Sequence, residues 1–154
     1  MIFKTLLEMT KNFPKDGRIM GLDVGSKTIG LAVSDSNLKV AAPVGTIQRK
    51  KFSKDADRLA AIISERAVFG LLLGLPLSMD GSEGRACQSV RQFAENLDRK
   101  IVIGITFWDE RLSTAAVERV LIKEADLTRK HRSRIIDELA AVYILQNALD
   151  SLVN

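Results

Sequence analysis

Two continuous apolar runs limit what this chain can fold into more than any other feature. Residues 69–75 and 101–108 carry almost no polar side chain over the length of a strand. Such runs are typical of strands that are buried on both faces, as in parallel sheets covered by helices. Apolar residues recur at helical spacing over 87–97, between the two runs. The chain is therefore expected to contain a strand–helix–strand unit with parallel strands.

The pattern of apolar segments and turn residues in the N-terminal half, by contrast, predicts antiparallel strands. Residues 18–24 and 29–34 are expected to be strands joined by a tight turn at 25–27. A third strand is expected over 40–47, where Pro43 indicates a sheet edge or a bulge. The predicted fold class is α/β, with a mixed five-stranded sheet of antiparallel hairpin strands plus parallel strands, flanked by helices.

The remaining segments complete one domain. Helices are predicted over residues 55–67, 87–97, 114–124 and 135–152. A length of 154 residues with 46% hydrophobic residues suits a single core. Residues 1–17 are expected to form an N-terminal extension with a short amphipathic helix, followed by one domain over 18–154.

Composition excludes several classes of protein. Cys87 is the only cysteine, which rules out an intramolecular disulfide and suits a reducing cytoplasm. His131 is the only histidine, so neither a zinc site nor a Cys–His nucleophile is expected. No segment approaches the roughly 20 apolar residues of a membrane span, and no membrane partner is expected.

Acidic residues mark the ends of apolar segments. Asp23 ends the first strand, Asp109 and Glu110 follow the apolar run 101–108, and Asp137 lies within the last predicted helix. Buried acids are costly unless they are paired or bind a metal, and converging carboxylates suit a hard divalent cation. We therefore expect a Mg²⁺ or Mn²⁺ site. The alternative for Asp137 is a solvent-facing acid near a helix N-terminus.

Basic residues are clustered although the net charge is only +4. Residues 49–51 form one cluster, and a second lies in a predicted loop. The nucleic-acid contacts expected are Lys27, Arg111, Arg129, Lys130, Arg132 and Arg134. Each cluster alone is typical of a solvated surface patch, and Arg111 alone of an ion-pair partner for Glu110. Because an acidic metal site is expected beside them, we favour contacts of these residues with the phosphates of a nucleic acid.

Four motifs in order resemble one known family. They are LDVGSKTIGLAVSD, GLPLSMDGS, DERLST and DELAAVYILQ, and the likeness extends over residues 18–152. The chain thereby resembles the YqgF family, also called RuvX, which has the ribonuclease H-like fold. Its members are described as nucleases that process the precursor of small-subunit ribosomal RNA and as Holliday junction resolvases. By matching position, the resemblance implies that Asp23, the Asp109–Glu110 pair and Asp137 are catalytic metal ligands.

Sequence alone leaves the choice within the acidic pair open. Neighbouring strand residues face opposite sides, so Asp109 and Glu110 cannot both point at Asp23 from a regular strand. Both faces of the run 101–108 are apolar, so alternation does not choose between them. We favour Glu110 as the ligand, with Asp109 either as a capping residue or as a hydrogen-bonding support for the ligands.

The mechanistic hypothesis is phosphodiester hydrolysis assisted by two metal ions roughly 4 Å apart. The substrate expected is structured RNA, cleaved at the 5′ end of pre-16S rRNA during ribosome biogenesis in the cytoplasm. An alternative is a Holliday junction resolvase, which should act on branched DNA as a homodimer.

Two alternatives belong to other classes. A non-catalytic nucleic-acid-binding module would bind with a steep salt dependence and turn nothing over. An actin-like nucleotide-binding ATPase would need a second phosphate loop and about twice this length, and the sequence has neither.

Overall fold

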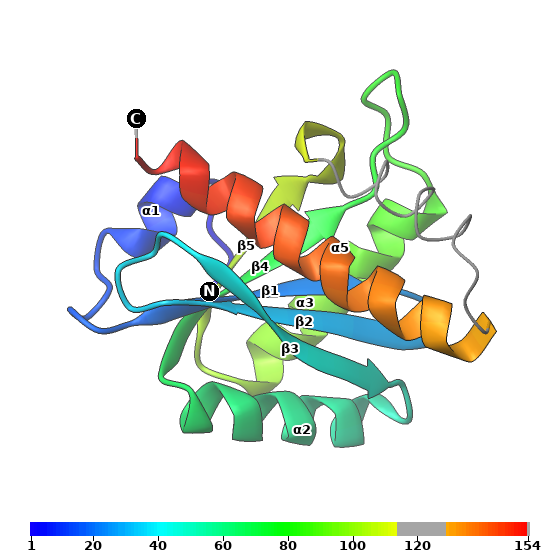
Figure 1. The fold of residues 1–154 in the computed structure, drawn as a ribbon, viewed down its shortest axis with the longest axis horizontal. Helices are drawn as coiled ribbons and strands as arrows, with labels where there is room; N and C mark the ends of the chain where they lie inside the picture. Colours follow the sequence, from blue (N-terminus) through cyan, green and yellow to red (C-terminus); the bar gives the residue numbers. More distant parts are fainter. Residues whose placement is uncertain (114–128, 154) are drawn as a thin grey trace.

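The computed structural model describes residues 1–113 and 129–153, and its centre is a five-stranded sheet (Figure 1). The strands are β1 (Arg18–Val24), β2 (Thr28–Ser34), β3 (Ala41–Gln48), β4 (Val68–Leu75) and β5 (Gly104–Asp109). Their order across the sheet is β3-β2-β1-β4-β5. The β1–β2 and β2–β3 pairs are antiparallel, whereas β4 pairs in parallel with both β1 and β5. The predicted mixed sheet is confirmed.

Helices cover both faces of the sheet. They are α1 (Leu6–Thr10), α2 (Phe52–Glu65), α3 (Arg85–Lys100), the 3₁₀ turn η1 (Glu110–Leu112) and α5 (Arg129–Ser151). Figure 1 shows α5 lying across one face, with α2 and α3 on the other side. The helix predicted over 114–124 lies outside the described residues.

Alternation along β4 divides the core into two layers. Leu71 and Leu73 are fully buried in the layer shared with α2 and α3, whereas Leu72 is fully buried in the layer under α5. The run 69–75 was predicted to be buried on both faces, and this is confirmed for these residues. Because β4 pairs in parallel with β1 on one side and β5 on the other, its carboxyl end lies beside the carboxyl ends of both strands.

Helix α5 packs unusually close to the sheet. A Cβ atom added to Gly21 of β1 would lie 2.9 Å from the Cβ of Leu145, and Ala141 beside it is fully buried. Small residues on both sides, Gly21 on the strand and Ala141 on the helix, permit this approach. The indole nitrogen of Trp108 also donates to the side-chain oxygen of Asn147 at 2.8 Å, which ties α5 to β5.

The start of α5 corrects one prediction. The basic residues Arg129 to Arg134 were expected in a loop before a helix beginning at Ile135, but the helix begins at Arg129. Arg129, Lys130, Arg132 and Arg134 therefore lie in its first two turns. The stretch lacks apolar periodicity, so the sequence did not distinguish a charged helical turn from a solvated loop.

Pro43 lies where a proline does least harm. Strand β3 is an edge strand, and its register with β2 shifts at the Leu31–Gly45 and Ala32–Pro43 pairs. Proline lacks the N–H that a central strand would need. An edge or a bulge was predicted from this residue, and the structure has both.

The N-terminal segment packs against the sheet beside α5. Its helix α1 is only five residues long. Ile2 forms a parallel bridge with Ile105, and Leu6 and Met9 are buried in the layer under α5. A Cβ atom on Gly70 would lie 2.7 Å from the Met9 methyl carbon, so this part of β4 has no room for one. The division of the chain at residue 17 stays a prediction.

None of the helices in the described residues is long and apolar enough to span a lipid bilayer.

Candidate active site

Asp23 lies at the carboxyl end of the central strand β1, with a glycine on each side. Gly30 on β2 is its partner in the antiparallel register. Gly74 on β4 lies one step beyond the Leu22–Leu73 pair, which places it beside Asp23 on the other side. Because neither of these neighbours has a side chain, other parts of the chain can pack directly on the sheet beside Asp23.

Helix α5 fills the space over Gly30. A Cβ atom on Gly30 would lie 2.0 Å from the backbone oxygen of Asp137 and 2.5 Å from its carbonyl carbon. Because paired residues of antiparallel strands point to the same face, the Asp23 side chain points toward α5 as well. Asp23 and Asp137, which are 114 positions apart in the chain, thus meet on one face.

The hydroxyl of Thr28 fixes the orientation of the Asp137 carboxylate. Its Oγ1 donates a hydrogen bond to Oδ2 of Asp137. Thr28 is the first residue of β2, two positions before Gly30, so the same strand supports the helix backbone and holds its acid. This contact of Thr28 with Asp137 was not predicted from the sequence.

Glu110 approaches Asp23 from the side of β4. A Cβ atom on Gly74 would lie 2.9 Å from Oε1 of Glu110 and 2.8 Å from the Cδ1 of Ile144 on α5. The Glu110 side chain therefore lies over Gly74, on the face that α5 covers. Asp23, Glu110 and Asp137 are all half-buried there.

Asp109 is directed to the opposite face. It pairs with Leu75, whose side chain belongs to the layer of α2 and α3. Its carboxylate accepts a hydrogen bond from the Arg111 backbone N–H at 2.9 Å and pairs with the guanidinium Nη2 at 2.7 Å. The Arg111 side chain holds the pKa of Asp109 below its ordinary value. Asp109 thus caps η1, as was favoured from the sequence.

A cavity of about 380 Å³ adjoins Asp109 on that face. Its walls include Lys4, Arg91 and Phe107, with the Arg91 guanidinium carbon 4.9 Å from the centre of the Phe107 ring. The cavity is therefore separated from Asp23 and Asp137 by the sheet.

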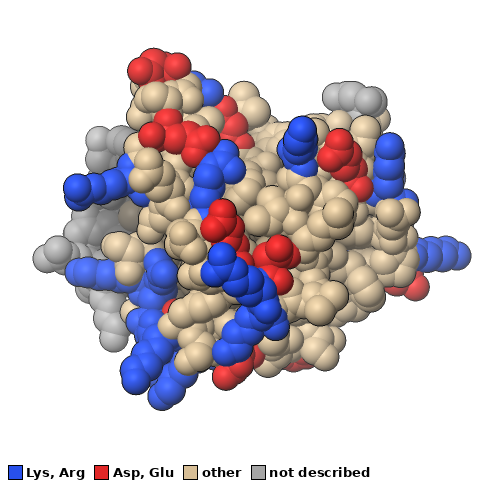
Figure 2. Space-filling view, turned by 180° about the vertical axis from the view of Figure 1, so that it is seen from behind, with Lys and Arg blue, Asp and Glu red and all other residues tan. Residues whose placement is uncertain are grey.

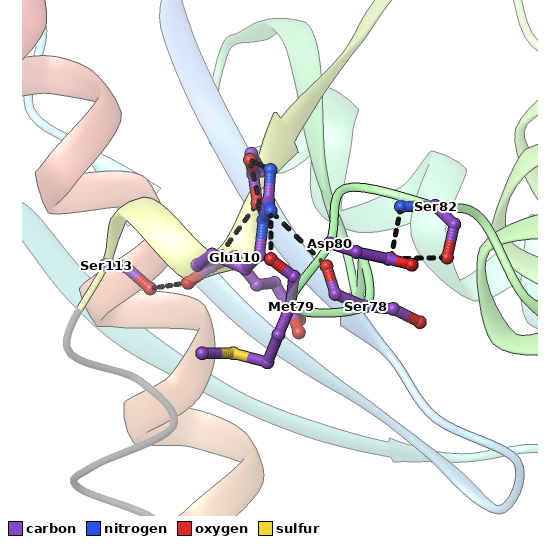
Figure 3. A network of polar contacts seen from close by, with 8 residues as sticks. Ser78, Met79, Asp80, Ser82, Glu110 and Ser113 are labelled. Carbon is purple, nitrogen blue, oxygen red and sulfur yellow. Dashed lines mark hydrogen bonds and ion pairs between the residues drawn. The ribbon is translucent and has the colours of Figure 1, made fainter.

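Arg111 connects η1 to the loop after β4. Its Nη1 donates to the backbone oxygens of Ser78 at 3.3 Å and Met79 at 3.2 Å, while the rest of the guanidinium binds Asp109. In Figure 3 this loop lies beside Glu110. The ion-pair partner of Arg111 that the structure records is Asp109, and its predicted phosphate contact stays a prediction.

The remaining predicted contacts surround the same end of the sheet. Lys27 is exposed in the turn between β1 and β2, and its backbone oxygen accepts a hydrogen bond from the Arg49 N–H at 2.8 Å. Phosphate binding by Lys27 and by the basic turns of α5 stays a prediction.

The glycines of the site make room for the parts of the chain that pack on the sheet. Gly30 lies inside β2 and leaves space for the helix backbone. A glycine inside a strand often marks a close approach of another backbone. That signal was present in the sequence at Gly30 and at Gly74.

The donor chemistry of this face fits a hard divalent cation. The site offers carboxylate oxygens from Asp23, Glu110 and Asp137, the ligands that Mg²⁺ prefers. Within residues 1–113 and 129–153, no three His, Cys, Asp or Glu side chains stand close enough to enclose an ion. Aspartate and glutamate side chains turn about their χ angles, and the missing side chains of Gly30 and Gly74 let Asp137 and Glu110 pack directly on the sheet beside Asp23.

A mixed sheet of this order, with an acid on its central strand and another on the helix across it, defines the ribonuclease H-like class. The crystal structure of RuvC from T. thermophilus in complex with a Holliday junction substrate has the same fold, with a TM-score of 0.55 at 10% sequence identity. That likeness covers 89% of this chain and 96% of RuvC.

Sequence comparison identifies the family. Residues 17–151 match the family profile RuvX, described as Holliday junction resolvase. A relative from Ruegeria pomeroyi is 56% identical over all of this chain and 99% of its own length. Another from Rhodospirillum centenum is 54% identical over 99% of this chain and 83% of its own. Both are provisionally named pre-16S rRNA nuclease. The chain belongs to the RuvX family.

Proposed function

We propose that this protein is a metal-dependent endonuclease that processes the 5′ end of pre-16S rRNA. The observation that carries the proposal is that Asp23, Glu110 and Asp137, from segments far apart in the chain, lie on the same face of the sheet. The names of the full-length relatives support the ribosomal substrate. We place the protein in the cytoplasm, where bacterial ribosomal precursors are processed.

Asp23, Glu110 and Asp137 would hold Mg²⁺ or Mn²⁺, and we favour two ions. A divalent cation bound there supplies an activated water and stabilises the departing oxygen. Asp23 is the central ligand in this proposal because its two strand neighbours, Gly30 and Gly74, are covered by Asp137 on one side and by Glu110 on the other. Asp109 is left out of the ligand set because it lies on the other face, bound to Arg111.

Other residues of the chain position the acids and the RNA. Thr28 donates to the Asp137 carboxylate and so fixes which oxygen can face Asp23. Lys27 is exposed in the adjoining turn, within reach of a phosphate that lies over the acids. The basic residues in the first two turns of α5 add positive charge where the helix dipole is also positive. Such contacts give affinity without reading bases.

Substitution of Asp23 tests the proposal. Asp23→Asn keeps the shape of the side chain but removes its charge, so we expect cleavage of a pre-16S rRNA fragment to be abolished while binding remains. The matched control is Asp16→Asn, because Asp16 is exposed in a loop before β1. Near-normal cleavage by Asp23→Asn with Mg²⁺ or Mn²⁺ present would refute the assignment of the site.

The acidic pair offers a second test. Glu110→Gln should lower the cleavage rate by at least about 100-fold, as expected for loss of a group that positions the reacting atoms. Asp109→Asn should leave most of the activity, since its carboxylate caps η1 on the other face. The opposite ranking would place the ligand at Asp109.

A second candidate substrate is four-way DNA, favoured by the description of the family profile. A resolvase must cut two strands related by two-fold symmetry, so it should sediment as a homodimer. Cleavage of four-way DNA and of pre-16S rRNA by the same preparation, compared at equal salt, decides between the two. If the protein binds both substrates in a salt-sensitive way and cleaves neither, it is a non-catalytic nucleic-acid-binding module.

A further inference from the structure

A second hollow lies on the face of the sheet opposite Asp23, between the start of α2 and α3. It has a volume of about 160 Å³ and is lined by Arg49, Phe52, Ser89, Gln92, Phe93 and Asn96. The α3 residues among these are spaced three and four apart, so they form one stripe of the helix. Pockets for drug-sized ligands have volumes of about 300–1,000 Å³. This hollow therefore suits one ring system rather than a whole nucleotide.

Flat groups form one side of the hollow. The ring of Phe52 meets that of Phe93 edge to face, with centres 5.6 Å apart and planes at 75°. The guanidinium carbon of Arg49 lies 5.2 Å from the centre of the Phe93 ring. Aromatic rings and arginine planes are the surfaces on which unpaired bases stack. The hollow can therefore hold a flat ring against Phe52 or Arg49.

Polar side chains line the rim. Ser89 and Gln92 are exposed, and the Gln92 amide donates to the Asn96 side-chain oxygen at 3.0 Å. Side-chain amides carry an acceptor oxygen and two donor hydrogens, and a hydroxyl can do either. Nucleobases present both donors and acceptors along their edges, so this rim matches a base better than it matches an apolar ring or a simple anion.

Positive charge surrounds the start of α2. Lys50 and Lys51 are exposed in the turn that leads from β3 into this helix. The buried carboxylate of Asp55 accepts a hydrogen bond from the Lys50 backbone N–H at 3.0 Å, which fixes the turn. In Figure 2, Lys and Arg gather at the lower left, the end of this face where α2 begins. A phosphate backbone is the complementary partner of such a surface.

Arg49 also connects the hollow to the turn that follows Asp23. Its Nη1 donates to the backbone oxygen of Gly25 at 2.7 Å, and its backbone N–H donates to Lys27 at 2.8 Å. Gly25 is two residues after Asp23 in the chain. The hollow and the acidic face therefore lie on the two sides of one hairpin turn.

We propose that this hollow binds a single unpaired nucleobase, from a single strand that continues past the hairpin turn from the acidic face. The base stacks on Phe52 or Arg49 and its edge meets Gln92 and Asn96, while the phosphates beside it contact Lys50 and Lys51. The proposal rests on the proposed nuclease function and adds a contact that selects an unpaired base near the cleaved bond.

Binding measurements on the Asp23→Asn protein test this without turnover. The probes are short single strands of one sequence, as RNA and as DNA, intact or with one abasic position moved along the strand. One abasic position should weaken binding by about tenfold, the loss expected for one stacked base. Gln92→Leu should weaken binding of the intact strand several-fold and leave the abasic strand unchanged. Whichever of the RNA and DNA strands binds more tightly identifies the type of strand that the hollow prefers.

Gln88→Leu is the matched control. Gln88 is an exposed glutamine on the same helix, one turn earlier, and it does not line the hollow. If Gln92→Leu and Gln88→Leu bind alike, or if no abasic position matters, the proposal is overturned. Either result leaves cleavage by the unsubstituted protein intact. Conversely, if the unsubstituted protein fails to cleave, the proposed nuclease function is contradicted, but the effect of an abasic position on binding still tests the hollow.

Discussion

Gly30→Ala is the most informative single change, because the structure specifies what the added methyl group meets. The new Cβ would lie 2.0 Å from the backbone oxygen of Asp137, whereas Cβ contacts under 3.0 Å are essentially never seen. Helix α5 and strand β2 must therefore separate by at least about 1 Å, since neither backbone can rotate away as a flexible side chain could.

Both stability and activity should respond to this separation. Overpacking of this kind costs about 1–3 kcal/mol, which lowers the melting temperature of a domain of this size by roughly 2–12 °C. A displacement of about 1 Å in a group that positions the reaction costs about 100-fold in rate. Asp137 moves with the helix, so single-turnover cleavage should fall by that order at temperatures well below the melting transition.

Gly84→Ala is the control for this prediction. A Cβ at Gly84 has no atom within 4 Å, and its φ of −93° suits any residue. It should change cleavage little. If Gly30→Ala melts and cleaves like the unsubstituted protein, the close packing of α5 on β2 is wrong. If it melts earlier but cleaves normally, Asp137 has no part in the reaction.

Two further predictions concern the other face of the sheet. Cys87 is fully buried, and burial raises the pKa of its thiol. Alkylation of this thiol should therefore be at least about 100-fold slower in the native protein than in urea. Rapid labelling of the native protein would contradict the burial of Cys87. Asp109→Asn should lower the free energy of unfolding by about 0.2–1 kcal/mol at pH 7, as for a partly exposed pair. Because the pKa of Asp109 is lowered on folding, its contribution is present above the unfolded value of about 3.9 and is lost as the pH falls below it. Urea midpoints at several pH values should show the two proteins converging in acid, and a constant difference would contradict the Arg111 contact.

The strands were predictable because their signals are local. The apolar runs of β4 and β5 need no knowledge of the partner, and the glycine-bearing turn after Asp23 fixes the hairpin. The proline in β3 likewise indicated the edge. The start of α5 was not predictable in the same way, since the sequence from Arg129 to Arg134 has no apolar residue whose spacing would indicate a helix.

The choice between Asp109 and Glu110 shows where local signals end. Both faces of β5 are apolar, so alternation carries no direction. The strand ends at Asp109, which caps the 3₁₀ turn, and this turn brings the Glu110 side chain over Gly74. That outcome depends on a tertiary contact with another strand, which no window of sequence contains. The contact partner of Gly30, the backbone of Asp137, likewise depends on tertiary packing, although a glycine inside a strand indicates a close approach.

The acids of the first strand and of the last helix meet only after α5 has docked on Gly30. Since a ribosome releases the chain from its N-terminus onward, Asp23 and Glu110 emerge well before Asp137. A chain on which α5 has not yet docked therefore lacks one of the three acids of the proposed site, and under the proposed function it would not yet cleave a phosphodiester bond.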